Sequence, residues 1–302
     1  MPVRPLGRVF RKLAQWAFYP AVLSGAVGAA LFCLRLGLRG FGVVFIGALF
    51  AACAIHVFER LLPYAKEWST PRRDVRTDAL HSIVSHGFLP VVLQATCYGS
   101  LFAVAGRLSH LFGGSLWPDS WPLLSQLLLA LVIADFGAYW GHRWAHELDW
   151  LWRFHAIHHS AQRLYWLNAG RFHPVDNIPG FILDVWPLIL LHAGDEAVAL
   201  FTVFTAANGM LRHSNVDARL GRLNWIFSTP DLHRWHHSKV IVEANANYAP
   251  NLMIWDICFG TRFLPKERLP STDIGISSMP DFPTGYFAQL VSPFLWSGPA
   301  GP

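Results

Sequence analysis

The segment DLHRWHHSK, residues 231–239, places His233, His236 and His237 within five positions. The spacing i, i+3, i+4 puts three side chains on one face of an α-helix. Neutral imidazole is a common protein ligand for iron, zinc, copper and nickel. The spacing therefore predicts a short helix whose histidines hold a metal ion.

Similar spacings occur earlier in the chain, in the segments HRWAH and HAIHH, and single histidines stand in RFHP and RHSN. This many imidazoles exceeds what one tetrahedral or octahedral ion can accept. The sequence therefore predicts two metal ions, and the candidate ligands are His142, His146, His155, His158, His159, His173, His213, His233, His236 and His237. The remaining histidines lie outside these motifs and are interpreted as ordinary polar residues: His56, His81, His86, His110 and His192.

Several polar residues near these motifs are candidates to orient the imidazoles. Asp135 shares a helical stripe with Tyr139, His142 and His146. Its carboxylate could fix the tautomer of an imidazole, or it could simply lie at the membrane boundary, and the pattern leaves both interpretations open. The same reasoning makes Asp176, Asn215 and Asp231 candidates.

The composition is that of a membrane protein, because 53% of the 302 residues are hydrophobic and only 14% are charged. The net charge of +5 comes from basic residues at the ends of apolar runs. That placement is typical of membrane topology signals, and we expect no nucleic-acid partner. The four cysteines include no C-x-x-C pair, which argues against a thiolate metal site.

Four segments approach the roughly 20 apolar residues that cross a bilayer, near 16–34, 41–58, 82–105 and 121–141. An anchored first helix is favoured over a cleaved signal peptide, because no small-residue cleavage site closes the first run. Residues 177–210 hold two shorter apolar runs around HAGDE, which predicts a re-entrant or shallow hairpin. The hairpin returns the chain to the same side, where the histidines before and after it can meet.

The basic loop between the second and third spans, with Arg60, Lys66, Arg72, Arg73 and Arg76, places the histidines in the cytoplasm by the positive-inside rule. The predicted fold class is all-α, an integral membrane four-helix bundle with a cytoplasmic histidine-rich helical cap. The expected organisation is transmembrane helices over 1–134, a catalytic domain over 135–265 and a C-terminal tail of surface structure with a loose end over 266–302.

The motifs HRWAH, LWRFHAIHHS, RFHP, HSN, TPDLHRWHH and NYAPNLMIWDICFGT occur in order between about Asp135 and Pro265. They resemble the fatty acid hydroxylase or sterol desaturase superfamily of membrane di-metal oxygenases. The resemblance implies metal ligation by the histidines of the three boxes and by His213. His173 matches a position that is not histidine in every branch, and Ala249 stands where many relatives have glycine.

The resemblance implies two iron ions, with zinc as a possible replacement, and O2 as co-substrate. It implies hydroxylation or desaturation of a lipid that enters from the bilayer, and sterols, ornithine lipids and ether lipids remain open as substrates. The sequence has no G-x-G-x-x-G, cysteine cluster or H-P-G-G motif, so a separate electron donor of cytochrome b5-like or ferredoxin-like type is expected.

Three competing interpretations were open at this level. A zinc-binding membrane transporter needs ligands near the middle of the spans, whereas these boxes follow the fourth span. A zinc hydrolase of H-E-x-x-H type needs a glutamate that HRWAH lacks. Acyl-CoA desaturases also carry histidine boxes, but their first two boxes are generally farther apart. The favoured location is a bacterial inner membrane, with the endoplasmic reticulum as the alternative.

Overall fold

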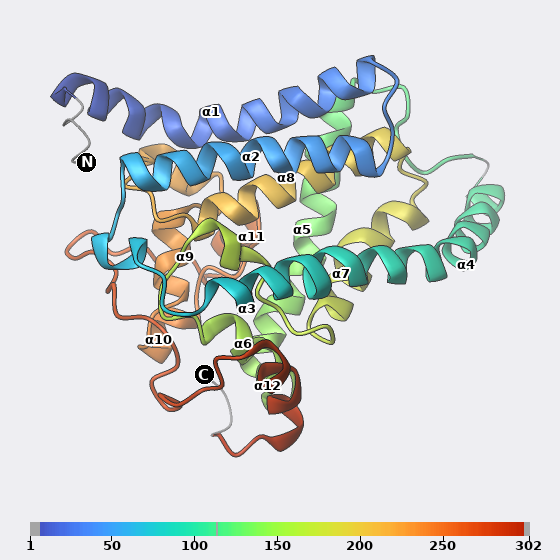
Figure 1. Cartoon of the computed structure of the whole chain (residues 1–302). Helices are drawn as coiled ribbons and strands as arrows, with labels where there is room; N and C mark the ends of the chain where they lie inside the picture. Colours follow the sequence, from blue (N-terminus) through green and yellow to red (C-terminus); the bar gives the residue numbers. More distant parts are fainter. Residues whose placement is uncertain (1–6, 113, 299–302) are drawn as a thin grey trace.

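The computed structural model describes residues 7–112 and 114–298 (Figure 1). Its main core lies among four helices: α1 (Arg8–Arg35), α2 (Phe41–Leu61), α5 (Leu123–Glu147) and α8 (Asp195–His213). Phe18, Ile55, Leu131 and Leu200 are among the buried apolar side chains that fill it. α1, α2 and α8 pack against one another, and α5 packs against α8. The fold is all-helical, because the described residues form only isolated β-bridges and no strand.

Three helices of the described chain are long and apolar enough to cross a membrane: α1, α2 and α5. They coincide with the predicted spans 16–34, 41–58 and 121–141. The predicted span 82–105 falls on a π-helical segment, η2 (His81–Phe88), and on α4 (Leu89–Phe112), which are not among the three. The observed architecture is therefore a helical protein with three candidate membrane helices. α5 also runs without a break across position 134, where the catalytic domain was expected to begin.

The segment around HAGDE separates two helices, as its short apolar runs predicted. α7 (Asn177–Leu190) ends at a turn in which His192 has a left-handed φ of 65°, and α8 follows from Asp195. α8 ends at His213 and therefore delivers this histidine to the other histidine-bearing segments. α7 crosses α5 closely, because a Cβ atom on Gly137 would lie 2.1 Å from the carbonyl oxygen of Leu183.

Short helices surround the end of α5 and carry the remaining motifs. α6 (Asp149–His159) follows α5 after a single residue, and Pro230 begins α9 (Pro230–His236), where a proline costs no helical hydrogen bond. The other short elements are η1 (Lys66–Ser69), α3 (Val75–Leu80), η3 (Trp166–Gly170), η4 (Gly221–Trp225), α10 (Ile241–Ala244), α11 (Ile254–Cys258), α12 (Tyr286–Val291) and η5 (Ser292–Leu295).

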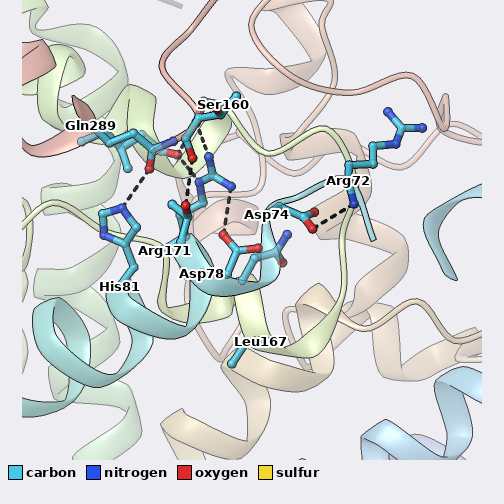
Figure 2. A network of polar contacts seen from close by, with 12 residues as sticks. Arg72, Asp74, Asp78, His81, Ser160, Leu167, Arg171 and Gln289 are labelled. Atoms are coloured by element: carbon cyan, nitrogen blue, oxygen red, sulfur yellow. Dashed lines mark hydrogen bonds and ion pairs between the residues drawn. The ribbon is translucent and has the colours of Figure 1, made fainter. Parts of the chain in front are cut away.

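A buried polar network holds the segment after α6 against α3 and α12. Arg171 donates to Asp78 at 2.9 Å and to Ser160 at 3.2 Å, while His81 Nε2 lies 2.8 Å from Gln289 Oε1 (Figure 2). Arg171, Asp78, His81 and Gln289 are almost inaccessible to water. Removing the hydrogen-bond partner of one of them would therefore leave a buried polar group unsatisfied. The network therefore fixes the segment that leads to Asp176.

The C-terminal tail is more closely packed than the predicted surface segment. Ile276 and Phe282 join Trp152 and Ile157 in a small apolar cluster, and Gln289 is fully buried. The apolar residues between the prolines account for this packing, since they cover the outer side of α6. The last four residues of the tail, 299–302, where a loose end was predicted, lie outside the described part.

Candidate metal centre

Nine of the ten candidate histidines come together in two adjacent groups. The first group is His142, His146, His155, His159 and His236, and the second is His158, His213, His233 and His237. Within each group, one nitrogen of every ring lies within 4.8 Å of those of the others. The groups touch, because the rings of His159 and His237 are stacked with centroids 4.5 Å apart.

The two repeated boxes divide their histidines between the groups in the same way. In HAIHH, His155 and His159 belong to the first group and His158 to the second. In HRWHH, His233 and His237 share the second group and His236 enters the first. On a helix, residue i+4 lies roughly 40° to one side of residue i, and residue i+3 roughly 60° to the other. Each box therefore contributes histidines to both groups, so a single short helical segment sets the position of one group relative to the other.

Oxygen acceptors face the Nδ1 atoms of five of these rings. The distances are 2.6 Å from His142 to the Tyr248 carbonyl, 2.8 Å from His236 to the Ala246 carbonyl, 2.9 Å from His155 to Asp176 Oδ2, 3.0 Å from His213 to Asn168 Oδ1 and 3.1 Å from His146 to Asn245 Oδ1. A ring that donates its Nδ1–H to such an acceptor keeps the Nε2 lone pair free. The surroundings thus select the tautomer that ligates through Nε2.

The Nε2 atoms converge without protein partners that would satisfy them. Nε2 of His233 lies 2.8 Å from that of His213 and 3.1 Å from that of His237, and Nε2 of His142 lies 3.1 Å from that of His155. Nε2 of His146, His159 and His236 is buried with no hydrogen-bond partner in the described part of the chain. Lone pairs this close together repel one another unless a cation lies between them. The donor set fits an imidazole-binding metal in each group.

Burial also keeps these imidazoles neutral, which is the form that binds metal. Loss of hydration lowers the pKa of His158, His159, His233 and His236 well below the usual value, and the neighbouring imidazoles lower it further. For the same reasons the pKa of His237 falls to about 3, with the charges of His155 and Arg212 adding to the effect of burial.

His173 is the one candidate ligand that the structure does not bring into either group. Its Nε2 lies 3.1 Å from the Leu290 carbonyl oxygen, and its Nδ1 accepts the backbone N–H of Val175 at 3.0 Å. Its ring packs against Phe154 and Phe294. In this position the side chain joins the C-terminal segment to the segment after α6.

Of the four candidate orienting residues, only Asp176 contacts an imidazole of the groups. Asp135 accepts hydrogen bonds from Asn251 Nδ2 and the Leu252 backbone. Asn215 bonds the backbone of Ala65, and Asp231 bonds Asn224 and Arg234.

Sequence reasoning missed Asn168, Asn245 and the two carbonyl groups that face Nδ1 atoms. Asn245 stands two residues before the NYAP motif, which gave a usable signal. A backbone carbonyl leaves no pattern in the sequence. The Ala246 and Tyr248 carbonyl groups could therefore be recognised as imidazole acceptors only from the three-dimensional structure.

Fold and site together define a helical membrane protein with two adjacent, buried, all-histidine groups suited to metal ions. The fatty acid hydroxylase family model matches residues 127–261. The ornithine lipid hydroxylase OlsE of Rhizobium tropici is 41% identical over 93% of this chain and 84% of its own length. The chain belongs to the fatty acid hydroxylase family.

More distant relatives match only about half of this chain. Human alkylglycerol monooxygenase is 33% identical over 51% of this chain and 33% of its own length. A very-long-chain aldehyde decarbonylase of rice is 29% identical over 46% of this chain and 53% of its own length. No solved structure matches significantly. The protein is therefore an oxidoreductase of the lipid hydroxylase type, and not a zinc transporter.

Proposed function

We propose that this protein hydroxylates a C–H bond of an ornithine lipid, using O2 and two iron ions bound by the nine grouped histidines. The observation that carries the proposal is the pair of adjacent all-imidazole groups in a chain with 41% identity to an ornithine lipid hydroxylase over 93% of its length. Iron held by imidazoles supplies the oxygen activation needed to break an unactivated C–H bond.

The protein's own part in this reaction is to position and shield the centre. The ligands come from α5, α6, α8 and α9, so packing of these helices sets the separation of the two groups. Trp152 and Tyr248 lie against the first group and are almost fully buried, which keeps bulk water from the reacting carbon. Two electrons come from a separate cytochrome b5-like or ferredoxin-like donor, because the sequence carries no motif of a redox cofactor domain.

The lipidome of a bacterial host with and without the protein tests the reaction. The expected result is an ornithine lipid heavier by one oxygen, together with about two iron ions per purified chain, or zinc in inactive protein. Loss of two hydrogens would indicate desaturation, and oxidation of an ether lipid alone would refute the substrate. One ion or none in an active preparation would refute the di-metal site.

We further propose that the protein lies in the bacterial inner membrane with its histidines on the cytoplasmic side. This orientation takes the predicted span 82–105, on α4, as a fourth crossing. Its support is the basic loop with Arg60, Arg72 and Arg76 and the predicted hairpin over 177–210, which returns the chain to the same side.

Single cysteines test this orientation in a variant that lacks the four native ones. Arg153→Cys and Val242→Cys lie at exposed positions near the two boxes, and Ser120→Cys lies before α5. An impermeant thiol reagent added to whole cells should label only the cysteine at 120. Labelling of 153 and 242 from opposite sides would exclude a shared site.

A further inference from the structure

Arg212, the residue before His213 at the end of α8, is a partly buried cation whose Nε and Nη1 atoms are enclosed by the protein. Its Nε and Nη1 atoms have no hydrogen-bond partner among the residues that the structure describes. The Arg212 charge acts on Asp135 and on imidazoles of both groups, including His142 and His233. The cation directly precedes His213, a member of the second group, and its Nε–H and Nη1–H groups are available.

Asp184, in the middle of α7, is a partly buried carboxylate. Its Oδ1 atom is enclosed and accepts no hydrogen bond from the residues that the structure describes. The charge of Asp135 acts on both Asp184 and Arg212. Asp135 forms no hydrogen bond with either of them among the described residues, and its two oxygens accept the N–H groups of Asn251 and Leu252.

Arg212 and Asp184 lie on two helices, α8 and α7, that both pack against α5 near Asp135. The Leu183 carbonyl lies against Gly137, and Asn251 bonds both Asp135 and Thr205 of α8. Arg212 and Asp184 form no ion pair with each other or with any other described residue. Burying a charge without a counter-charge is costly, and proteins normally pair such groups or use them for function. Two groups of opposite charge, each with enclosed atoms that no described residue satisfies, indicate a ligand that carries one charge of each sign.

We propose that Arg212 binds the carboxylate and Asp184 the ammonium group of a zwitterionic lipid headgroup, held beside the histidine centre. The planar guanidinium suits a carboxylate, to which it can donate two parallel hydrogen bonds. The inference rests on the proposed function, since ornithine acylated on one amine keeps a carboxylate and a second, cationic amine. A sterol or an ether glycerolipid alcohol offers neither charge.

Lipid binding by the purified, metal-loaded full chain tests the assignment without relying on turnover. The probes are ornithine lipid, its methyl ester, its N-acetyl derivative and phosphatidylethanolamine, each measured by competition in lipid nanodiscs. We expect the wild type to prefer ornithine lipid at least tenfold over each of the others. Arg212→Gln should bind the free acid and the methyl ester alike, while still rejecting the N-acetyl derivative. Asp184→Asn should show the reverse selectivity.

The surface pair Arg39–Glu196, at the other end of α8, supplies matched controls. Arg39→Gln and Glu196→Gln make the same chemical changes and should leave all four affinities unchanged. Metal-free Arg212→Gln and Asp184→Asn should be at least as heat-stable as wild type, because each removes a charge whose enclosed atoms have no described partner. A large loss of stability would assign a structural role to these residues and overturn the proposal.

The lipid selectivity of the wild type and of the two variants distinguishes failure of the headgroup site from failure of the proposed function. Unchanged selectivity in both variants overturns the headgroup assignment even if the wild type hydroxylates ornithine lipid. Equal wild-type affinity for phosphatidylethanolamine overturns the choice of a carboxylate. Selective binding without any hydroxylated product would instead refute the proposed function and leave the headgroup site standing.

Discussion

The two nitrogens of a histidine in this centre have different surroundings. In His236, Nδ1 faces the Ala246 carbonyl at 2.8 Å, while Nε2 is buried in the first group without a partner. In His173 both nitrogens contact backbone groups, so neither is free. The free nitrogen, and not burial alone, separates a metal-binding imidazole from a structural one.

This difference predicts opposite results for two histidine variants. His236→Ala should lose most of the bound metal and all measurable product, while still inserting into the membrane, because the spans are stabilised by apolar packing. His173→Gln should keep about two metal ions per chain. Metal analysis of both variants at equal membrane yield checks the prediction. Equal metal content in the two would contradict the ligand assignment.

At the scale of elements, the crossing of α5 and α7 depends on one missing side chain. Gly137 lets the backbone of Leu183 approach so closely that a Cβ atom would overlap its carbonyl group. Asp184 follows directly in the chain, so the crossing also sets the position of this carboxylate. Helices in membranes commonly use small residues for such close contacts.

Gly137→Ala should therefore push α7 away from α5 and destabilise the fold by about 2 kcal/mol, a typical cost of overpacking. Gly28→Ala in α1 is the matched control, because a Cβ atom there meets no neighbouring atom within 4 Å. The midpoint of thermal unfolding in detergent compares the two. A midpoint for Gly137→Ala equal to that of the control would show that the helices can separate without cost.

At the scale of the whole molecule, the buried histidines link stability to pH. The folded pKa of His237 is about 3, compared with an ordinary value of 6.5. Below pH 6.5, His237 binds a proton in the unfolded chain but stays neutral in the folded chain, so acid favours unfolding. The contribution of neutral His237 to the free energy of unfolding is fully present above pH 6.5 and is lost progressively as the pH falls toward 3.

Metal-free protein should consequently unfold at a lower temperature at pH 5 than at pH 7. Zinc-loaded protein should resist this change until protons displace the ions, because only neutral imidazole binds metal. Calorimetry of both forms across this range checks the prediction. A constant unfolding temperature for the metal-free form would mean that the grouped histidines already accept protons in the fold.

Some features of this protein follow from its sequence alone. Hydropathy predicted α1, α2 and α5, because a run of apolar residues long enough to cross a bilayer must satisfy its backbone within one helix. Helical spacing predicted eight of the nine grouped histidines, because i, i+3 and i+4 share a helix face whatever surrounds it, and the family resemblance added His213.

Only the tertiary structure divided the nine histidines into five and four and left His173 outside. Helical spacing fixes which face a ring occupies but not which helix packs opposite it. The acceptors behind the rings, from Asn168 to the Tyr248 carbonyl, come from segments distant in sequence. The unpaired charges of Arg212 and Asp184 appear only in three dimensions too, because whether a charge has a partner depends on what folding places beside it.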